Sequence, residues 1–243
     1  MIKFENTAVM NFEGAFRGMR NPLNSWDKSD SGLCLRDMDD CKVCYPAVTC
    51  PKNGDFEEDY YCIGKNDLNL AQRLIKAGPD HRKFLRQIFV SVDITAPLYW
   101  WKEFDTYKVG TVSNSCSTMH KIHAKEFSID DFSHEHLINE PLTVIEPGIV
   151  NTYNLQAKCM LEVLIMVLNT AREMYLKTKD KKYWWQMIQL LPSSYNQKRT
   201  ITLTYETLRN IRGSRRNHKL DEWSIGFMEW IDSLPYAEEL IKI

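Results

Sequence analysis

The feature that most constrains the fold is a strand-like alternation that stops at a proline. Every second position from 88 to 94 carries a branched aliphatic side chain, namely Ile88, Val90, Val92 and Ile94. A period of two is typical of a strand with one buried face. Ala96-Pro97 ends the alternation, because proline cannot donate a hydrogen bond to a neighbouring strand and suits the first turn of a helix. A helix with an aromatic face is therefore expected from Leu98 to about Tyr107.

A polar segment, Lys108–Thr118, follows this helix. Its side chains are rich in hydroxyl, amide, thiol and ammonium groups, which can present many hydrogen-bond donors to a polar ligand. An ordinary loop rich in serine and threonine is the alternative, and composition alone favours that alternative. The segment is one of two candidate ligand-binding regions in the chain.

The second candidate region is a basic stretch near the C-terminal end. It contains Arg212, Gly213-Ser214, Arg215, Arg216 and His218. Guanidinium groups without neighbouring acids suit a phosphate, because their paired N–H groups match its oxygens. The glycine allows the backbone to approach a ligand closely. A solvated basic turn is the alternative, and it is the more common outcome for a run of charges.

The overall composition limits the class of protein. A length of 243 residues fits one domain, and a hydrophobic content of 44% is enough for a sizeable core. The net charge of −1 gives no general attraction to nucleic acid or to a membrane surface, so neither is expected as a partner. No apolar run reaches the length of a membrane span, and the first residues do not resemble a signal peptide. We therefore expect a cytoplasmic protein.

Residues 32–64 differ in composition from the rest and hold five of the seven cysteines. We interpret them as a cysteine-rich insertion or long surface loop within a single domain of residues 1–243. Cys41-x2-Cys44 has the spacing of one arm of a zinc site, with Cys34, Cys50 or Cys62 as possible partners. A second Cys-x2-Cys pair is missing, so thiols without metal are the favoured interpretation and no metal site is predicted.

The remaining patterns predict an α+β fold, with an antiparallel sheet flanked by helices. Strands are expected at residues 2–9, at a sheet edge, and at 200–204. Helices are expected at 12–19, 68–77, 151–178, 181–191, 205–211 and 220–234. Asn66-Asp67 is expected to cap the second, and the last has an apolar stripe of Trp223, Phe227, Trp230 and Ile231. The longest is apolar almost all round from Cys159 to Leu168. We therefore expect it to pack centrally, with this part buried in the core or by another subunit.

The order of these elements resembles that of the flavin-dependent thymidylate synthases, the ThyX family, from about Asn66 to Leu234. The matching features are the helix and strand that lead to Ala96-Pro97, the aromatic helix after them, Leu191-Pro192, and the pair His218-x3-Glu222. The resemblance covers most of the chain, and it is carried by the order of elements more than by any single motif.

The signature of that family, R-H-R-x-x-S-x-N-E-x-S-x-R-Y, is altered in this chain. Counted from the Ala-Pro pair, Lys108 falls on its second arginine and Thr111 on its first serine. Counted from its end, Asn114 and Ser117 fall on the asparagine and the second serine. The two counts differ by one residue, and both stay open. The leading Arg-His, the closing Arg-Tyr and the arginine before the Leu-Pro pair are absent.

The resemblance implies an enzyme that transfers a methylene group from methylenetetrahydrofolate, and a hydride, to dUMP or a related pyrimidine nucleotide. NADPH would be the reductant, and FAD would bind at a subunit interface of a homotetramer. The flavin carries the redox chemistry in such an enzyme, while the protein supplies position and charge. Because several signature arginines are missing, a catalytically inactive ThyX-fold module that binds nucleotide or protein is the alternative.

Two sets of site residues follow from the resemblance and the two candidate regions together. The flavin site is expected at His81, Lys108, Thr111, Asn114 and Ser117. The substrate phosphate is expected at Arg212, Arg215 and His218. No enzymic nucleophile is required, so Cys116 need not react, and catalytic residues stay unassigned.

Overall fold

The computed structural model describes residues 2–33, 61–145 and 152–243. The chain divides into two compact units, which we describe separately. Unit 1 comprises Met1–Lys3, Ile94–Thr106 and Asn114–Arg199. Unit 2 comprises Phe4–Asp93, Tyr107–Ser113 and Thr200–Ile243.

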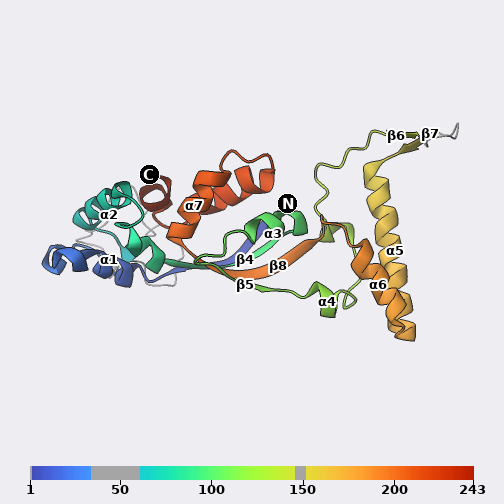
Figure 1. The fold of residues 1–243 in the computed structure, drawn as a ribbon, viewed down its shortest axis with the longest axis horizontal. Helices are drawn as coiled ribbons and strands as arrows, with labels where there is room; N and C mark the ends of the chain where they lie inside the picture. Colours follow the sequence, from blue (N-terminus) through green and yellow to red (C-terminus); the bar gives the residue numbers. More distant parts are fainter. Residues whose placement is uncertain (1, 34–60, 146–151) are drawn as a thin grey trace, which may run out of the picture. The chain divides into compact units, whose positions relative to one another are not determined.

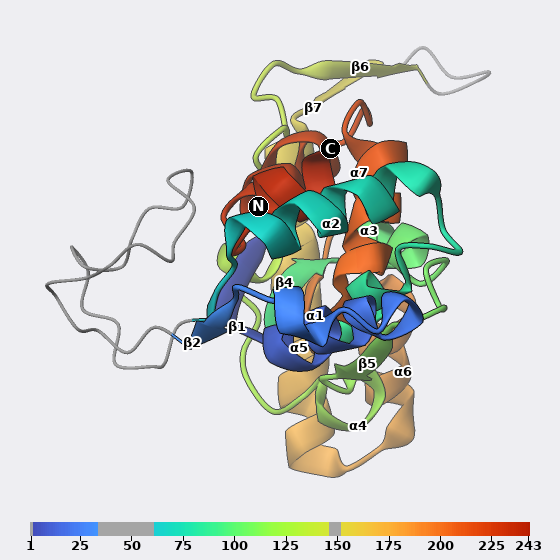
Figure 2. The same ribbon diagram turned by 90° about the vertical axis from the view of Figure 1, so that its left-hand side faces the viewer.

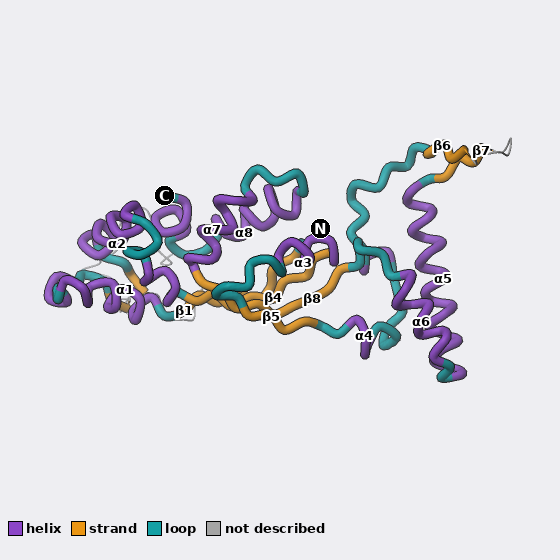
Figure 3. The backbone as a smooth tube through the Cα atoms, viewed as in Figure 1, coloured by secondary structure: helices purple, strands orange, loops and turns teal. Residues whose placement is uncertain are grey.

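The main sheet has four antiparallel strands, which run alongside one another in Figure 3. In spatial order they are β1 (Lys3–Met10), β4 (Phe89–Pro97), β8 (Asn196–Thr204) and β5 (Val112–Ser115). The edge position of β1 was expected from residues 2–9. The other edge, β5, lies within the polar segment that composition alone had favoured as a loop. The α+β class with an antiparallel sheet is confirmed.

The alternation that predicted β4 matches its burial. Val90, Val92, Ile94 and Ala96 are buried, whereas Phe89 is exposed. The strand ends at Pro97, and α3 (Leu98–Phe104) begins directly after it. The buried face of α3 is aromatic, with the Trp100 and Trp101 ring centroids 4.9 Å apart and those of Trp100 and Phe104 5.0 Å apart. Burying each such ring contributes on the order of 2–3 kcal/mol, so this helix is firmly attached.

Unit 2 is built mainly from helices. They are α1 (Phe12–Arg20), η1 (Asn21–Leu23), η2 (Trp26–Lys28), α2 (Lys65–Ala77), η4 (Lys83–Gln87), α7 (Tyr205–Arg215), η6 (Glu222–Phe227), α8 (Met228–Asp232) and η7 (Glu238–Lys242). Figure 2 shows α2 beside the C-terminal helices. The apolar stripe expected in the last helix is buried: Trp223, Phe227, Trp230 and Ile231.

The expected cap of α2 is wrong. Asn66 and Asp67 were expected to precede a helix starting at Leu68, but α2 already begins at Lys65. The Asp30 side chain instead accepts hydrogen bonds from the backbone N–H groups of Asn66 (2.8 Å) and Asp67 (3.0 Å). A cap from a residue so distant in sequence leaves no local signal, which is why the local Asn-Asp pair was chosen.

Asp67 is fully buried inside unit 2, where it accepts several hydrogen bonds. Arg20 Nε lies 2.6 Å from one carboxylate oxygen, and the Ser29 hydroxyl and the Ser31 backbone N–H donate to the other at 2.7 and 3.1 Å. Burial alone raises the pKa of Asp67, but the hydrogen bonds from Ser31, Ser29 and Arg20 outweigh burial and hold the pKa below the usual aspartate value. The group therefore stays ionised and joins α1, α2 and the chain between them.

The ends of the cysteine-rich segment pair with each other. β2 (Gly32–Leu33) is antiparallel to β3 (Tyr61–Cys62), with Gly32 opposite Cys62 and Leu33 opposite Tyr61. The zinc ligands considered in the sequence, Cys34, Cys41, Cys44 and Cys50, lie outside the described residues. Within the described ranges no group of three or more metal-ligating side chains comes together.

Unit 1 contains a pair of helices, α5 (Ala157–Thr178) and α6 (Lys181–Leu190), which lie side by side in Figure 1. The unit also contains α4 (Thr118–Lys121), η5 (Ile129–Asp131) and the antiparallel hairpin of β6 (Leu142–Ile145) and β7 (Thr152–Leu155). The longest helix was expected from residue 151, but residues 152–155 pair with β6, so α5 begins only at Ala157. Strand pairing with a distant segment therefore overrides the local helical pattern.

The face of α5 that was expected to be hidden is not covered by the residues that the structure describes. Met160, Val163, Met166 and Val167 are 44–67% exposed. Within its unit, α5 packs mainly against α6 and η5, and its buried residues are Leu161, Leu168 and Ala171. Among the described residues, none of the helices combines the length and the apolar character that a bilayer-spanning segment requires.

The first prediction concerns the pH dependence that Asp67 gives to folding. Its pKa is lowered in the folded state, so its stabilisation is fully present above the unfolded pKa of about 3.9 and is lost as pH falls through the folded value. Asp67→Asn leaves Arg20 buried without a counter-charge, which costs about 3–5 kcal/mol at neutral pH. In urea unfolding from pH 7 to pH 3, the difference between wild type and variant should shrink below the unfolded pKa.

The matched control is Asp27→Asn, which removes an exposed carboxylate from the same unit. This variant should differ from wild type by less than about 0.5 kcal/mol at every pH. A constant difference between wild type and Asp67→Asn across the whole pH range would contradict the assignment.

Candidate functional site

The polar segment Lys108–Thr118, which we call the donor-rich segment, is divided between the two units. Its first part belongs to unit 2 and packs on the start of α7. Gly110 has φ of 72°, and a Cβ atom at this position would lie 2.9 Å from the Thr207 hydroxyl. The same hydroxyl donates to the Val109 carbonyl oxygen at 3.3 Å. Only glycine permits both the backbone conformation and this close approach. Lys108 and Thr111 flank the contact and are therefore held in fixed positions.

Lys108 and Thr111 each lack a side-chain partner among the described residues, but they differ in exposure. The Lys108 ammonium is exposed, and within the described part of the chain it forms no ion pair. The Thr111 hydroxyl oxygen is buried and lacks a hydrogen-bond partner among the described residues. A buried hydroxyl without a partner is uncommon, because leaving it unsatisfied costs about 1–3 kcal/mol.

The second part of the donor-rich segment belongs to unit 1. Asn114 lies on β5 with its side chain exposed. The Ser117 hydroxyl oxygen accepts from the His120 backbone N–H at 3.0 Å and so caps α4. The backbone of Cys116 is fixed from both sides, because its N–H donates to the Lys198 carbonyl (2.9 Å) and its carbonyl accepts from Gln197 Nε2 (2.7 Å). Ser117 thus has a structural role that its sequence position did not indicate.

His81 lies in the turn between α2 and η4 in unit 2. Its backbone N–H donates to the Gly78 carbonyl oxygen at 3.0 Å, and its side chain is exposed. Across residues 2–33, 61–145 and 152–243, the imidazole makes no hydrogen bond or ion pair. It therefore stays a predicted flavin contact without a geometric link to the other four residues.

The basic stretch is helical where a turn was expected. α7 continues to Arg215, because helix propensity and packing override Gly213-Ser214, which cost only about 1 kcal/mol as helix breakers. Arg215 Nε donates to the Tyr107 hydroxyl at 2.7 Å, and its guanidinium carbon lies 5.2 Å from the Trp223 ring centroid. His218 Nδ1 accepts from the Leu220 backbone N–H at 3.1 Å. Arg215 and His218 are thus engaged within the chain.

Arg212 instead lines a cavity of about 360 Å³ in unit 2, which we call the basic cavity. Its charged lining residues are Arg82, Arg209, Arg212, Arg216 and Lys242. Three of these share one face of α7, since positions 209, 212 and 216 follow helical spacing. That spacing is visible in the sequence and could have identified Arg209. Arg82 and Lys242 come from distant segments and had no local signal.

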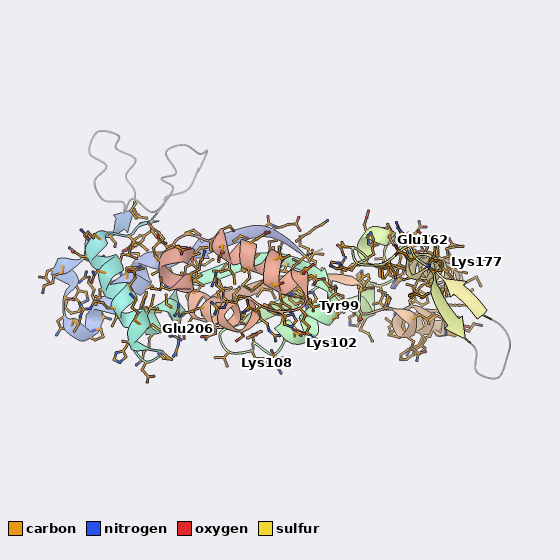
Figure 4. The ribbon with its side chains drawn as sticks, turned by 90° about the horizontal axis from the view of Figure 1, so that it is seen from above. Tyr99, Lys102, Lys108, Glu162, Lys177 and Glu206 are labelled. Atoms are coloured by element: carbon orange, nitrogen blue, oxygen red, sulfur yellow. The ribbon has the colours of Figure 1, made fainter. Side chains whose placement is uncertain are left out.

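Acidic residues offset part of this positive charge. Arg82 Nε lies 3.1 and 2.9 Å from the two carboxylate oxygens of Glu206, a residue labelled in Figure 4. Asp232 accepts from Arg212 Nε (3.4 Å) and from Lys242 Nζ (3.3 Å). A further carboxylate, that of Glu238, lies 2.6 Å from the same lysine.

Two arginines of the basic cavity retain uncompensated charge. Arg209 Nη1 donates to the neutral Ile241 carbonyl oxygen at 2.8 Å. Burial, together with the charge of Arg82, lowers the pKa of Arg209 against the opposing effect of Glu206. Arg216 is exposed and forms no ion pair in the described part of the chain. The cavity therefore has an excess of positive charge that suits a phosphate.

No protein-family model and no curated protein sequence matches the chain. The solved structures that are similar to it include two of thymidylate synthase X (ThyX) from Helicobacter pylori, each with FAD and dUMP. The first has a TM-score of 0.61 at 14% identity and covers 100% of this chain and 98% of its own. The second has a TM-score of 0.59 at 14% identity, with coverages of 99% and 97%.

The chain has a ThyX-like fold. The likeness extends over the whole length of both proteins, so it includes the order of elements from which the resemblance was recognised. At 14% identity it establishes the fold alone. The altered signature in the segment after α3 is consistent with a divergent protein of this fold.

The second prediction follows from the position of Arg215 in this ThyX-like chain. Arg215→Ala removes a hydrogen bond to Tyr107 and the stacking of the guanidinium on Trp223. The two contributions together should lower the free energy of unfolding by about 1–3 kcal/mol. Arg216→Ala at the neighbouring exposed position should change it by less than about 0.5 kcal/mol. Urea unfolding of both variants measures the difference, and equal stability of the two would contradict the structural role of Arg215.

Proposed function

We propose that the protein is a flavin-dependent thymidylate synthase-like enzyme that transfers a methylene group and a hydride to dUMP or a related pyrimidine nucleotide. The observation that carries this proposal is the full-length likeness to a ThyX enzyme solved with FAD and dUMP. Methylenetetrahydrofolate would supply the methylene group and NADPH the reducing equivalents.

The basic cavity would hold the phosphate of the nucleotide. Arg216 and Arg209 provide guanidinium groups that form no ion pair with any carboxylate among the described residues. Arg212 shares Asp232 with Lys242, so its N–H groups are only partly engaged. Of the three phosphate ligands predicted from the sequence, this proposal retains Arg212. It replaces Arg215 and His218 by Arg209 and Arg216, because Arg215 and His218 have partners elsewhere in unit 2.

The donor-rich segment carries the charge and the hydrogen-bond donors that could bind FAD. Residues 108–117 include no carboxylate, so nothing in the segment repels the pyrophosphate of FAD. Lys108 would attract that group as a point charge, and the Thr111 hydroxyl would gain the partner that it lacks. Asn114, Ser117 and His81 would add donors. The bound flavin would pass the hydride, while these side chains hold and orient it.

The exposed apolar face of α5 would be covered by further copies of the chain in a homotetramer. Met160, Val163, Met166 and Val167 are the kind of contiguous apolar residues that oligomer contacts bury. The reaction belongs to nucleotide biosynthesis, so we place the protein in the cytoplasm.

A catalytically inactive nucleotide- or protein-binding module of the same fold is the second candidate. The observation that favours it is the loss of arginines, because Lys108 is the only cation in residues 108–117. An ammonium keeps the charge but lacks the paired N–H donors of a guanidinium. Formation of dTMP from dUMP, methylenetetrahydrofolate, NADPH and FAD distinguishes the enzyme from the module, which would bind nucleotide without turnover.

The third prediction tests the phosphate site by calorimetric titration. Wild type should bind dUMP more tightly than deoxyuridine, because only the nucleotide engages the basic cavity. Arg216→Gln should weaken dUMP binding roughly tenfold, since it removes a charge-assisted hydrogen bond. Arg216 is chosen because no acid in the described part of the chain pairs with it, so its loss leaves none of those acids without a partner.

Lys219→Gln is the matched control, because it removes an exposed charge nearby that does not line the cavity. It should leave the affinity for dUMP within about twofold of wild type, as expected for an exposed charge that does not contact the phosphate. If wild type binds nucleotide and nucleoside equally, or if both variants lose the same affinity, the phosphate does not bind in the basic cavity.

A further inference from the structure

Unit 1 contains a second pocket, which shares no residue with the basic cavity. Its volume is about 410 Å³, and it is formed by α4 and the residues after it, the end of α5 and the start of α6. The side chains that define it are His120, His123, Tyr175, Lys179, Lys181 and Trp184. We call it the lysine–aromatic pocket.

The walls of this pocket are held together by contacts between its elements. The indole N–H of Trp184 donates to the Met119 carbonyl oxygen at 3.1 Å and so joins α6 to α4. Arg172 Nε on α5 donates to the His123 carbonyl oxygen at 3.0 Å. The His123 and Tyr175 rings meet edge to face, with centroids 5.0 Å apart. The pocket is therefore preformed, which lowers the entropic cost of binding a ligand.

Positive charge is concentrated at the pocket and is not neutralised there. Lys179 Nζ lies 5.9 Å from the Tyr175 ring centroid, and Lys181 Nζ lies 5.9 Å from that of Trp184. The acid between the two lysines, Asp180, pairs instead with Lys182 at 3.2 Å. No carboxylate lines the pocket, and in the described part of the chain neither Lys179 nor Lys181 forms an ion pair.

His123 adds a polar atom that has no partner. Its Nδ1 is buried, and the described residues provide no hydrogen bond to it. Buried polar atoms in folded proteins are almost always satisfied by protein, water or ligand. His123 lines the same pocket as the two lysines, but its Nδ1 atom is closed off from solvent, so the imidazole serves as part of the pocket wall.

We propose that the lysine–aromatic pocket binds a small aromatic phosphate monoester. The aromatic ring of the ligand packs against Trp184 and Tyr175, because flat apolar rings stack well on such side chains. The phosphate lies near Lys179 and Lys181. Their two ammonium groups match the charge and the acceptor oxygens of a phosphate. This site is additional to the proposed nucleotide and flavin sites.

The experiment is a calorimetric titration of the full chain with phenyl phosphate, with phenol and inorganic phosphate in parallel. The test variant is Lys179→Gln with Lys181→Gln, since glutamine keeps part of the side-chain stem and removes the charge. The matched control is Lys158→Gln with Lys177→Gln, which removes the same charge from α5 outside the pocket and leaves the pair of Asp180 and Lys182 intact (Lys177 is labelled in Figure 4).

Phenyl phosphate should bind more tightly than either phenol or inorganic phosphate, since only it uses both the rings and the cations. The test variant should lose at least about tenfold in affinity. The control should stay within about twofold of wild type.

Phenyl phosphate should also shift the indole N–H resonance of Trp184 in NMR spectra of wild type, with Trp184→Phe identifying that resonance. Equal loss in both double variants, or phenyl phosphate binding no better than phosphate alone, would overturn the proposal. Binding that leaves the Trp184 resonance unchanged would overturn it as well.

Discussion

The structure depends on one central strand, β4, which is buried on one face and ends at Pro97. Because the side chains of a strand alternate, its register decides which face carries the core, and a shift of one residue would expose Val90, Val92 and Ile94. The proline then starts α3, whose aromatic residues pack inside unit 1. The polar segment that follows α3 is therefore attached to a rigid element.

Some arginines of unit 2 form an ion pair with an acid, whereas others form none within the described residues. Arg20 and Arg82 pair with the buried or half-buried acids Asp67 and Glu206, where they serve folding. Arg209 and Arg216 form no ion pair within residues 2–33, 61–145 and 152–243, and they are the groups to which a phosphate would bind. A count of basic residues in the sequence cannot separate these classes, because the acids that pair with them come from other segments.

The sequence predicts most of the fold where the pattern is local and long. The alternation of β4, the stop at Pro97 and the apolar stripe of the last helix are each determined by neighbouring residues. The exceptions depend on pairing between distant segments: Asp30 caps α2, and β6 shortens α5.

The candidate site is less predictable from sequence for the same reason. Arg212, which the sequence proposed, lines the basic cavity, whereas Arg82 and Lys242 reach it only through the fold. Arg215 contacts Tyr107 and Trp223, and neither contact has a local signal in the sequence.

The central claim is that a ThyX-like chain with an altered signature still uses a flavin. The most direct measurement is the absorbance spectrum of the purified protein, with the released cofactor identified after denaturation. The account predicts bound FAD, or stoichiometric uptake of added FAD that is weakened by Lys108→Gln. Protein that is colourless as purified and does not bind FAD at high micromolar concentration would contradict the account and leave a binding module of the same fold.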